Sequence, residues 1–182
     1  RTASALEAAF ARRDLAAVDA LLGDPLETIE HPTATRYGRD GQLESSRRMM
    51  RMPDLEFRIE PLATLGEALG LFRRVVTASG TAGGRFDVGA YEIESIVLMA
   101  ADAAGRITAS EVFAADHLGP AIGRLHARYA ESLPAGPERT RTEGVARTYA
   151  FWNDVIDPEG VPSVTAPSFV HVDHRSLGTW SA

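Results

Sequence analysis

Four segments of the sequence have the alternating pattern of β-strands and are separated by short turns. The first, Leu55–Glu60, alternates apolar with charged side chains, as a strand with one buried face does. The next three run from Leu69 to Thr81, from Phe86 to Ala100 and from Arg106 to Ala115. Chain segments joined by such short turns pair antiparallel. The pattern therefore predicts a sheet of long antiparallel strands, and this constrains the fold more than any other feature.

The region before these strands has mostly helical patterns. Ser4–Leu22 carries apolar residues at helical spacing. Within it, Asp14 is predicted to be the N-cap of a second short helix that ends at Gly23. A further helix is predicted from Asp40 to Met50.

Two other segments complete the predicted set. Leu26–His31 reads as a strand, and Thr33–Gly38 as a turn with a short return strand. After the long strands, Asp116–Leu133 is predicted to be a helix with Asp116 as its N-cap. This order of elements predicts an α+β fold in which a curved antiparallel sheet wraps around the N-terminal helices, a cystatin-like roll.

The end of the chain repeats its beginning. LETIEH, residues 26–31, matches FVHVDH, residues 169–174, and a predicted helix, Thr142–Ile156, precedes the second stretch. Between the two copies, LPAGPERT contains the prolines and glycine of a linker. The predicted division is a domain at residues 1–132, a linker at 133–141, and the helix and first strand of an incomplete second copy at 142–182.

The composition excludes several classes of protein. The formal net charge of −6 gives a duplex nucleic-acid partner no general electrostatic support. The chain has no cysteine, so disulfides and thiolate metal sites are impossible. No apolar run approaches the roughly 20 residues that span a membrane. We therefore expect a cytoplasmic protein that binds neither nucleic acid nor membranes.

Three stretches resemble a known family: GRDGQLES (residues 38–45), ITASEVFAADHLGPAIGRL (107–125) and VDHRSLG (172–178). They resemble the SnoaL-like polyketide cyclases, within the superfamily of ketosteroid isomerase and nuclear transport factor 2. Their order resembles the tandem SnoaL-like modules of large actinobacterial proteins. The resemblance implies an apolar cavity between sheet and helices, a small apolar or aromatic partner molecule, and a homodimer formed through the open sheet face.

Glu111 is the leading candidate for acid–base chemistry. It alternates with Ile107, Ala109 and Phe113, so it lies on an otherwise apolar face of its strand. Burial there would raise the pKa of its carboxyl group and suit it to proton transfer. The alternative is that Glu111 faces solvent or pairs with an arginine of a neighbouring strand, such as Arg73.

Further candidates come from neighbouring segments. His31 and Tyr37 could act as a base and a hydrogen-bond donor at the mouth of the cavity, although a histidine at a strand end is often a surface residue. Arg58, Arg73 and Glu94 are the predicted substrate-binding residues, and the two arginines could instead neutralise nearby acids.

Metal binding has little support in the sequence. His171 and Asp173 lie two residues apart on one face of a predicted strand, but two potential ligands do not define a metal site. We therefore predict neither a metal site nor a cofactor.

Two functions remain open from the sequence. The first is a SnoaL-like domain that binds a small apolar ligand, with or without acid–base activity of the polyketide cyclase or isomerase type. The second is a non-catalytic dimerisation or spacer module of a larger regulatory protein. The fold alone does not decide between them, because it supports many functions.

Overall fold

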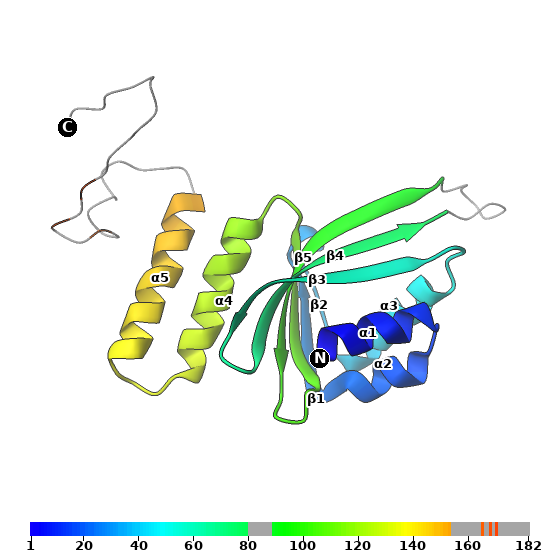
Figure 1. Ribbon diagram of the computed structural model, residues 1–182, viewed down its shortest axis with the longest axis horizontal. Coiled ribbons are helices and arrows are strands. Elements are labelled where there is room, and N and C mark those ends of the chain that lie inside the picture. Colours follow the sequence, from blue (N-terminus) through cyan, green and yellow to red (C-terminus); the bar gives the residue numbers. More distant parts are fainter. Residues whose placement is uncertain (80–88, 154–164, 166–167, 169, 171–182) are drawn as a thin grey trace, which may run out of the picture.

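A six-stranded sheet separates two groups of helices in the computed structural model (Figure 1). The structure describes residues 1–79, 89–153, 165, 168 and 170. The helices are α1 (Thr2–Ala11), α2 (Leu15–Leu21), α3 (Arg39–Met50), α4 (Leu118–Ser132) and α5 (Pro137–Asn153), with a short 3-10 helix at His31–Thr33. The strands are β1 (Leu22–Glu30), β2 (Thr35–Tyr37), β3 (Glu56–Leu65), β4 (Leu69–Ala78), β5 (Tyr91–Ala101) and β6 (Ile107–Ala114).

The strand order is β2-β1-β6-β5-β4-β3. All neighbouring pairs are antiparallel except β1 and β6, which run parallel and bring the first long strand beside the last. The predicted α+β roll is confirmed. The parallel pair was not foreseen, because turn lengths specify only the pairing of strands that are consecutive in the chain.

The two faces of the sheet bury different helices. Helices α1 to α3 cover the inner face, where Phe10 and Phe57 stack with ring centroids 4.0 Å apart. Helix α4 covers part of the outer face, and Leu125 packs there against the strands. The apolar residues under α4 also include Leu69, Leu71, Ile96, Leu98 and Phe113. The face of the sheet to which a strand side chain points therefore decides whether α1 to α3 or α4 can cover it.

Of the predicted helix caps and ends, one is confirmed and two are wrong. Asp14 caps α2 as predicted, since its side chain accepts a hydrogen bond from the Ala17 amide at 2.9 Å. Gly23 does not end that helix but lies in β1, where a Cβ would come within 3.0 Å of Thr108. His117, not Asp116, holds the N-cap position of α4.

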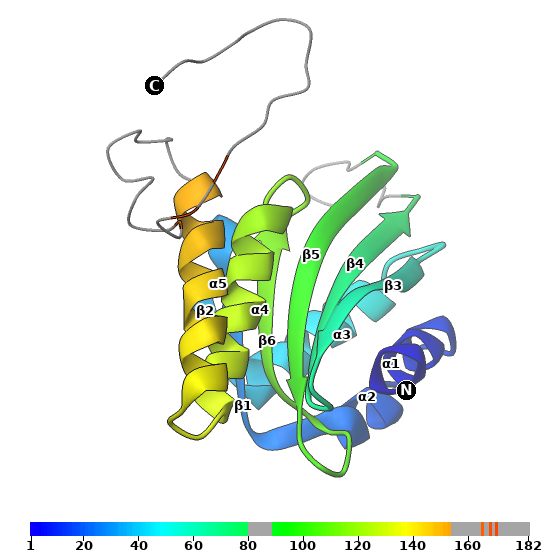
Figure 2. The ribbon, with the colours of Figure 1, turned by 60° about the vertical axis from the view of Figure 1, so that its left-hand side comes forward.

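Helix α5 begins earlier than predicted. The sequence favoured Thr142 as its start, but the helix begins at Pro137, within the predicted linker. Proline suits the first turn of a helix, because the amide it lacks would have no partner there. Helix α5 packs alongside α4, and a Cβ at Gly123 would lie 3.3 Å from the Cβ of Tyr149 (Figure 2).

Two predicted strand segments fall outside the described residues. These are the start of the strand predicted from Phe86, and the FVHVDH stretch apart from Val170, which is exposed and not in a strand. The proposed second copy at residues 142–182 is thus seen here mainly as helix α5.

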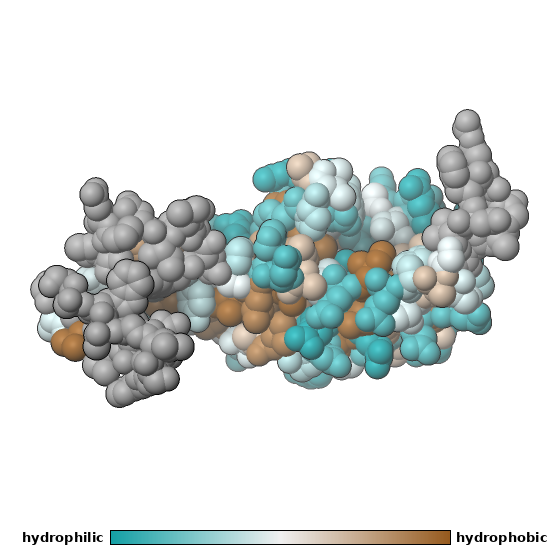
Figure 3. All heavy atoms as spheres, turned by 90° about the horizontal axis from the view of Figure 1, so that it is seen from above, coloured by the Kyte–Doolittle hydropathy of each residue, from teal (hydrophilic) through white to brown (hydrophobic). Residues whose placement is uncertain are grey.

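The surface carries scattered apolar side chains. Viewed from above, brown apolar residues reach the surface near the middle of the molecule, among teal hydrophilic ones (Figure 3). Large exposed apolar residues include Leu62, Ile93 and Leu118. None of the helices in the described residues is long and apolar enough to cross a membrane.

Candidate functional site

An internal cavity of about 40 Å³ lies between helices α1 to α3 and the inner face of the sheet. Most of its wall is apolar, with Leu6 and Phe10 from α1 and Met49 from α3 facing the strands. The strand residues in the wall are Leu22, Leu26, Thr28, Tyr37, Phe57, Ile59, Arg74, Val97, Met99, Ile107, Ser110 and Val112. Such an apolar interior with a few polar groups is the usual form of a small-molecule site.

Five polar side chains reach this cavity: Thr28, Tyr37, Gln42, Arg74 and Ser110. Their positions follow from the two-residue period of strands, because Thr28 and Ser110 are paired in register and point to the same side. Thr28 donates a hydrogen bond to the side chain of Gln42 at 3.2 Å. The cavity therefore has an apolar body with a cluster of hydrogen-bonding groups.

Tyr37 is the one predicted catalytic residue that lines the cavity. Its hydroxyl donates a hydrogen bond to Glu30 at 2.7 Å. Burial raises the pKa of Tyr37 well above its ordinary value, and the bond to Glu30 raises it further. The phenol therefore stays protonated at neutral pH and serves as a hydrogen-bond donor.

Arg74 also lines the cavity, whereas the residue predicted from the sequence to bind substrate was its neighbour Arg73. Arg74 alternates with Phe72 and Val76, so it shares their inward-facing side of β4. Its Nε donates to the hydroxyl of Ser95 at 3.0 Å. Burial lowers the pKa of Arg74, because an apolar surrounding disfavours the charged form.

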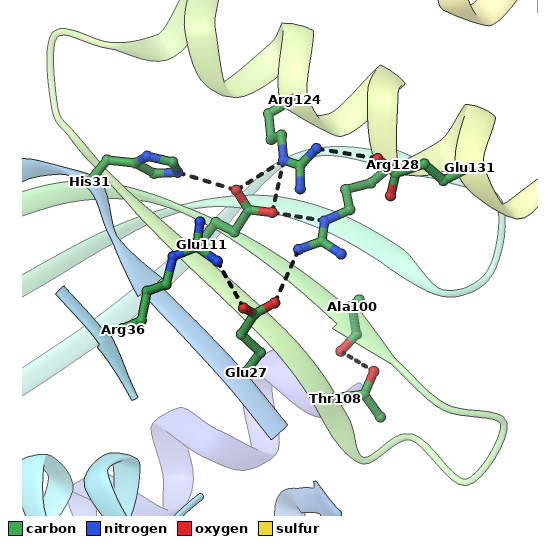
Figure 4. Close-up of polar contacts among 9 residues, drawn as sticks. All are labelled: Glu27, His31, Arg36, Ala100, Thr108, Glu111, Arg124, Arg128 and Glu131. Atoms are coloured by element: carbon green, nitrogen blue, oxygen red, sulfur yellow. Dashed lines mark hydrogen bonds and ion pairs between the residues drawn. The ribbon is translucent and has the colours of Figure 1, made fainter. Parts of the chain in front are cut away.

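Glu111 lies on the opposite face of the sheet, under α4 (Figure 4). Its side chain is 1% exposed. Arg124 Nε donates to both carboxylate oxygens, at 2.9 and 3.0 Å, and Arg128 Nε donates to Oε1 at 2.8 Å. Glu111 does not line the cavity. Its arginine partners come from α4. The alternative pairing with Arg73 is wrong, because Arg73 pairs with Glu94 instead.

The expected rise in the pKa of Glu111 is wrong. Burial alone would raise the pKa, but the hydrogen bonds and charges of Arg124 and Arg128 outweigh burial and hold it below its ordinary value. Glu111 in turn raises the pKa of Arg124 against the effect of burial. The carboxylate is thus ionised and fully paired, which is typical of a structural ion cluster.

His31 belongs to the Glu111 cluster and not to the cavity. Its Nε2 lies 3.2 Å from Glu111 Oε2, and its ring stacks on Phe113 at 4.3 Å between centroids. His31 begins the 3-10 helix that follows β1, so these contacts join that segment to β6. The structure therefore brings His31 to Glu111 but leaves Tyr37 on the other face.

The cluster extends across the surface through alternating charges. Arg124 also contacts Glu131 at 3.3 Å, and Arg128 lies 3.9 Å from Glu27. Glu27 pairs with Arg36 at 3.0 Å. In Figure 4 these residues form one chain of contacts around the buried Glu111.

The predicted substrate-binding residues lie away from the cavity, on the outer face of the sheet. Arg73 pairs with Glu94 at 3.1 Å, and both are exposed. Arg58 is exposed and is in register with Val75 and Glu94. The structure thus brings these three together on one surface, and none of them contributes to the cavity wall.

No group of three or more histidine or acidic side chains in the described part of the chain could hold a metal ion. His126, on α4, has its pKa lowered by burial and stacks with Tyr149 at 6.0 Å.

Comparison of the sequence with protein-family models finds no match, and none of the curated proteins matches it either. Solved structures do match. A candidate polyketide cyclase from Xanthomonas campestris pv. campestris has a TM-score of 0.50 and 21% identity, covering 61% of this chain and 85% of that one. IdmH, a candidate polyketide cyclase from Streptomyces antibioticus, has a TM-score of 0.53 and 18% identity, covering 62% and 88%.

A third similar structure has no assigned activity. It is an uncharacterized cystatin-fold protein from Novosphingobium aromaticivorans, with a TM-score of 0.51 and 17% identity, covering 62% of this chain and 94% of that one. At such identities the likeness concerns the fold. The chain therefore has the α+β roll seen in these three structures, as the order of elements in its sequence predicted.

Proposed function

We propose that this chain binds a small, mainly apolar molecule in the cavity between α1 to α3 and the sheet. The observation that carries the proposal is the convergence of Tyr37, Arg74 and three neutral polar side chains on an otherwise apolar interior space. Tyr37, Arg74 and Thr28 each donate one hydrogen bond to the protein, to Glu30, Ser95 and Gln42. Their remaining hydrogen-bonding capacity is open to a polar ligand atom or ordered water.

The cavity limits the size of this molecule. Its volume of about 40 Å³ is far below the roughly 300–1,000 Å³ of pockets for drug-sized ligands. A ligand larger than about one or two water molecules must therefore displace wall side chains. Met49 is suited to such movement, because methionine is unbranched and repacks easily. We propose a single ring or a short chain as the apolar body.

Acid–base chemistry in this cavity would draw on Tyr37 and Glu30, since Glu111 and His31 lie on the other face of the sheet. Two structures with the same fold are described as candidate polyketide cyclases. Transfer of that activity, or of isomerase activity, to this chain is an extension of the binding proposal. Turnover of an aromatic polyketide or a ketosteroid, measured directly, would test it.

Ser110 and Glu111 provide a discriminating pair for the binding proposal. A panel of neutral apolar molecules, such as toluene, phenol and cyclohexanone, is screened by ligand-observed NMR. We expect at least one to bind, Ser110→Val to weaken its binding about tenfold by filling the cavity, and Glu111→Gln to leave it unchanged. Failure of every molecule to bind, or weakening by Glu111→Gln with no effect of Ser110→Val, would contradict the proposal.

The exposed outer face supports a second candidate function, the dimerisation or spacer module. The part of this face not covered by α4 carries both charge signs, with Arg58, Arg73 and Glu94 among them. A twofold interface places one patch against itself, so a patch of mixed charge is self-complementary. We propose a second copy of this chain as the partner.

Sedimentation equilibrium tests the dimer. The second candidate predicts a dimer at about micromolar concentration, which charge reversal in Arg73→Glu dissociates and which Arg48→Glu, on exposed α3, leaves intact. A monomer under these conditions, or a dimer that Arg73→Glu does not affect, would remove the interface.

A further inference from the structure

We infer that the ligand of the cavity is a small apolar carboxylic acid, and that Arg74 binds its carboxylate. The inference rests on the proposed binding function and names the chemical class of its ligand. It follows from which N–H groups of the Arg74 guanidinium have hydrogen-bond partners and which do not.

Arg74 has hydrogen-bonding capacity that the described part of the chain leaves unused. A guanidinium has five N–H donors, and only the Nε–H of Arg74 has a described partner, the hydroxyl of Ser95. The terminal NH₂ groups, which form the end of the fork, make no hydrogen bond or ion pair among the described residues. Arg74 lines the cavity, so a ligand there can reach this fork.

Three other arginines of the sheet and α4 are paired with carboxylates, whereas Arg58 on β3 is exposed to solvent. Arg73, Arg124 and Arg128 contact carboxylates at 3.1, 2.9 and 2.8 Å. Arg74 differs from them in being inward-facing and lacking such a contact within the described residues. Arg74 is partly buried, and the charge of Glu30 acts on it without a direct ion pair. A carboxylate that reaches its terminal NH₂ groups would add direct, charge-assisted hydrogen bonds.

Glu30, the acid whose charge acts on Arg74, is already engaged by other groups. Glu30 acts on Arg74 through its charge, but its Oε1 accepts from Tyr37 and its Oε2 from Thr33. Glu30 forms no ion pair with Arg74. A carboxylate has two oxygens at the spacing of the guanidinium fork and binds it in a bidentate manner.

The cavity wall fixes the rest of the ligand. Phe10, Val97 and Val112 present apolar surface, and the wall contains no acidic residue. An acid with a compact apolar body, such as an aromatic or short-chain carboxylic acid, would match both the charge and the surface. Long-chain acids would have to displace far more of the wall than these compact acids, because the cavity has only about 40 Å³.

Matched pairs of acid and amide test this inference, because each pair has one shape and two charge states. Benzoate, phenylacetate and hexanoate are compared with their amides by ligand-observed NMR and calorimetry. The proteins are the unaltered chain, Arg74→Met, Arg74→Lys and the surface control Arg48→Met. Arg74→Met replaces an unpaired inward-facing charge by an apolar chain of similar length, so we expect it to fold.

We expect at least one acid to bind the unaltered chain about tenfold more tightly than its amide. Arg74→Met should abolish this preference and leave amide binding unchanged, Arg74→Lys should retain part of it, and Arg48→Met should retain all of it. If amides or the neutral molecules bind as well as acids, this inference is wrong and the binding proposal stands. If acids, amides and neutral molecules all fail to bind, both are wrong.

Discussion

Ser110 and Glu111 are consecutive residues of β6, yet their side chains lie on opposite faces of the sheet in unlike surroundings. Ser110 lines the apolar cavity under α1 to α3. Glu111 is held by Arg124 and Arg128 under α4. The residue with the most conspicuous chemistry thus serves the attachment of a helix, while the candidate site lies behind it.

Removal of the Glu111 charge should destabilise the fold. Glu111→Gln leaves Arg124 and Arg128 without their shared buried partner, and breaking a buried ion pair costs about 2–4 kcal/mol when the cations are partly exposed. Chemical denaturation measures the loss. Glu131→Gln is the matched control, because Glu131 is exposed and contacts Arg124 at the surface, so it should cost less than about 1 kcal/mol. Equal losses in the two variants would contradict a buried cluster.

The contribution of Glu111 should depend on pH in the acid range. Its folded-state pKa lies below the ordinary value of 4.5, so ionised Glu111 stabilises the fold above that pH and the stabilisation is lost as pH falls through the folded-state pKa. The difference in unfolding free energy between the unaltered chain and Glu111→Gln should therefore be larger at about pH 5 than at about pH 3. A difference that grows toward low pH would mean that the pKa of Glu111 is raised.

Gly41 of α3 should resist replacement by alanine. Alanine normally stabilises a helix by about 0.5–1 kcal/mol relative to glycine. A Cβ at Gly41, however, would lie 2.7 Å from the Cβ of Tyr37, so Tyr37 must shift and its bond to Glu30 is disturbed. We expect Gly41→Ala to destabilise the chain by about 1–3 kcal/mol.

Gly144 of α5 is the matched control for Gly41. A Cβ there would meet only the end of the Arg147 side chain, at 3.8 Å, so Gly144→Ala should stabilise the chain slightly. Stabilisation by both substitutions would show that Tyr37 is not packed against α3 as described.

The two aspartates near helix starts should differ in their effect on stability. Asp14 accepts a hydrogen bond from the Ala17 amide, and loss of such a cap costs about 1 kcal/mol. Asp116 precedes α4 without capping it, so Asp116→Ala should change the unfolding free energy by less than about 0.5 kcal/mol. Thermal unfolding of Asp14→Ala and Asp116→Ala compares the two directly, and a larger loss at Asp116 would contradict the described start of α4.

The alternation of side chains predicted the strands and the buried position of Glu111, but not which face encloses the cavity. A period of two divides a strand into two sides without saying what covers each. Arg74 is on the same side of β4 as Phe72 and Val76, and Arg73 is on the other side. The sequence alone does not show which of these two sides the N-terminal helices cover. The placement of these helices depends on contacts between residues distant in the sequence.

The partners of Glu111 left a weaker signal in the sequence. Arg124 and Arg128 lie four residues apart, which places both on one side of a helix. That spacing puts two positive charges side by side on the helix, but it does not identify Glu111 as their partner. The parallel pairing of β1 with β6, which brings His31 to the same cluster, also joins residues from opposite ends of the domain.

Intermolecular NOEs between a bound molecule and labelled methyl groups test the location of the site most directly. The methyl groups of Leu26, Val97 and Val112 line the cavity, whereas those of Leu71 and Leu98 lie under α4 with Glu111. A bound apolar acid should show NOEs to the first set and none to the second. NOEs to Leu71 and Leu98, without any to Leu26, Val97 or Val112, would contradict the assignment of the site to the cavity.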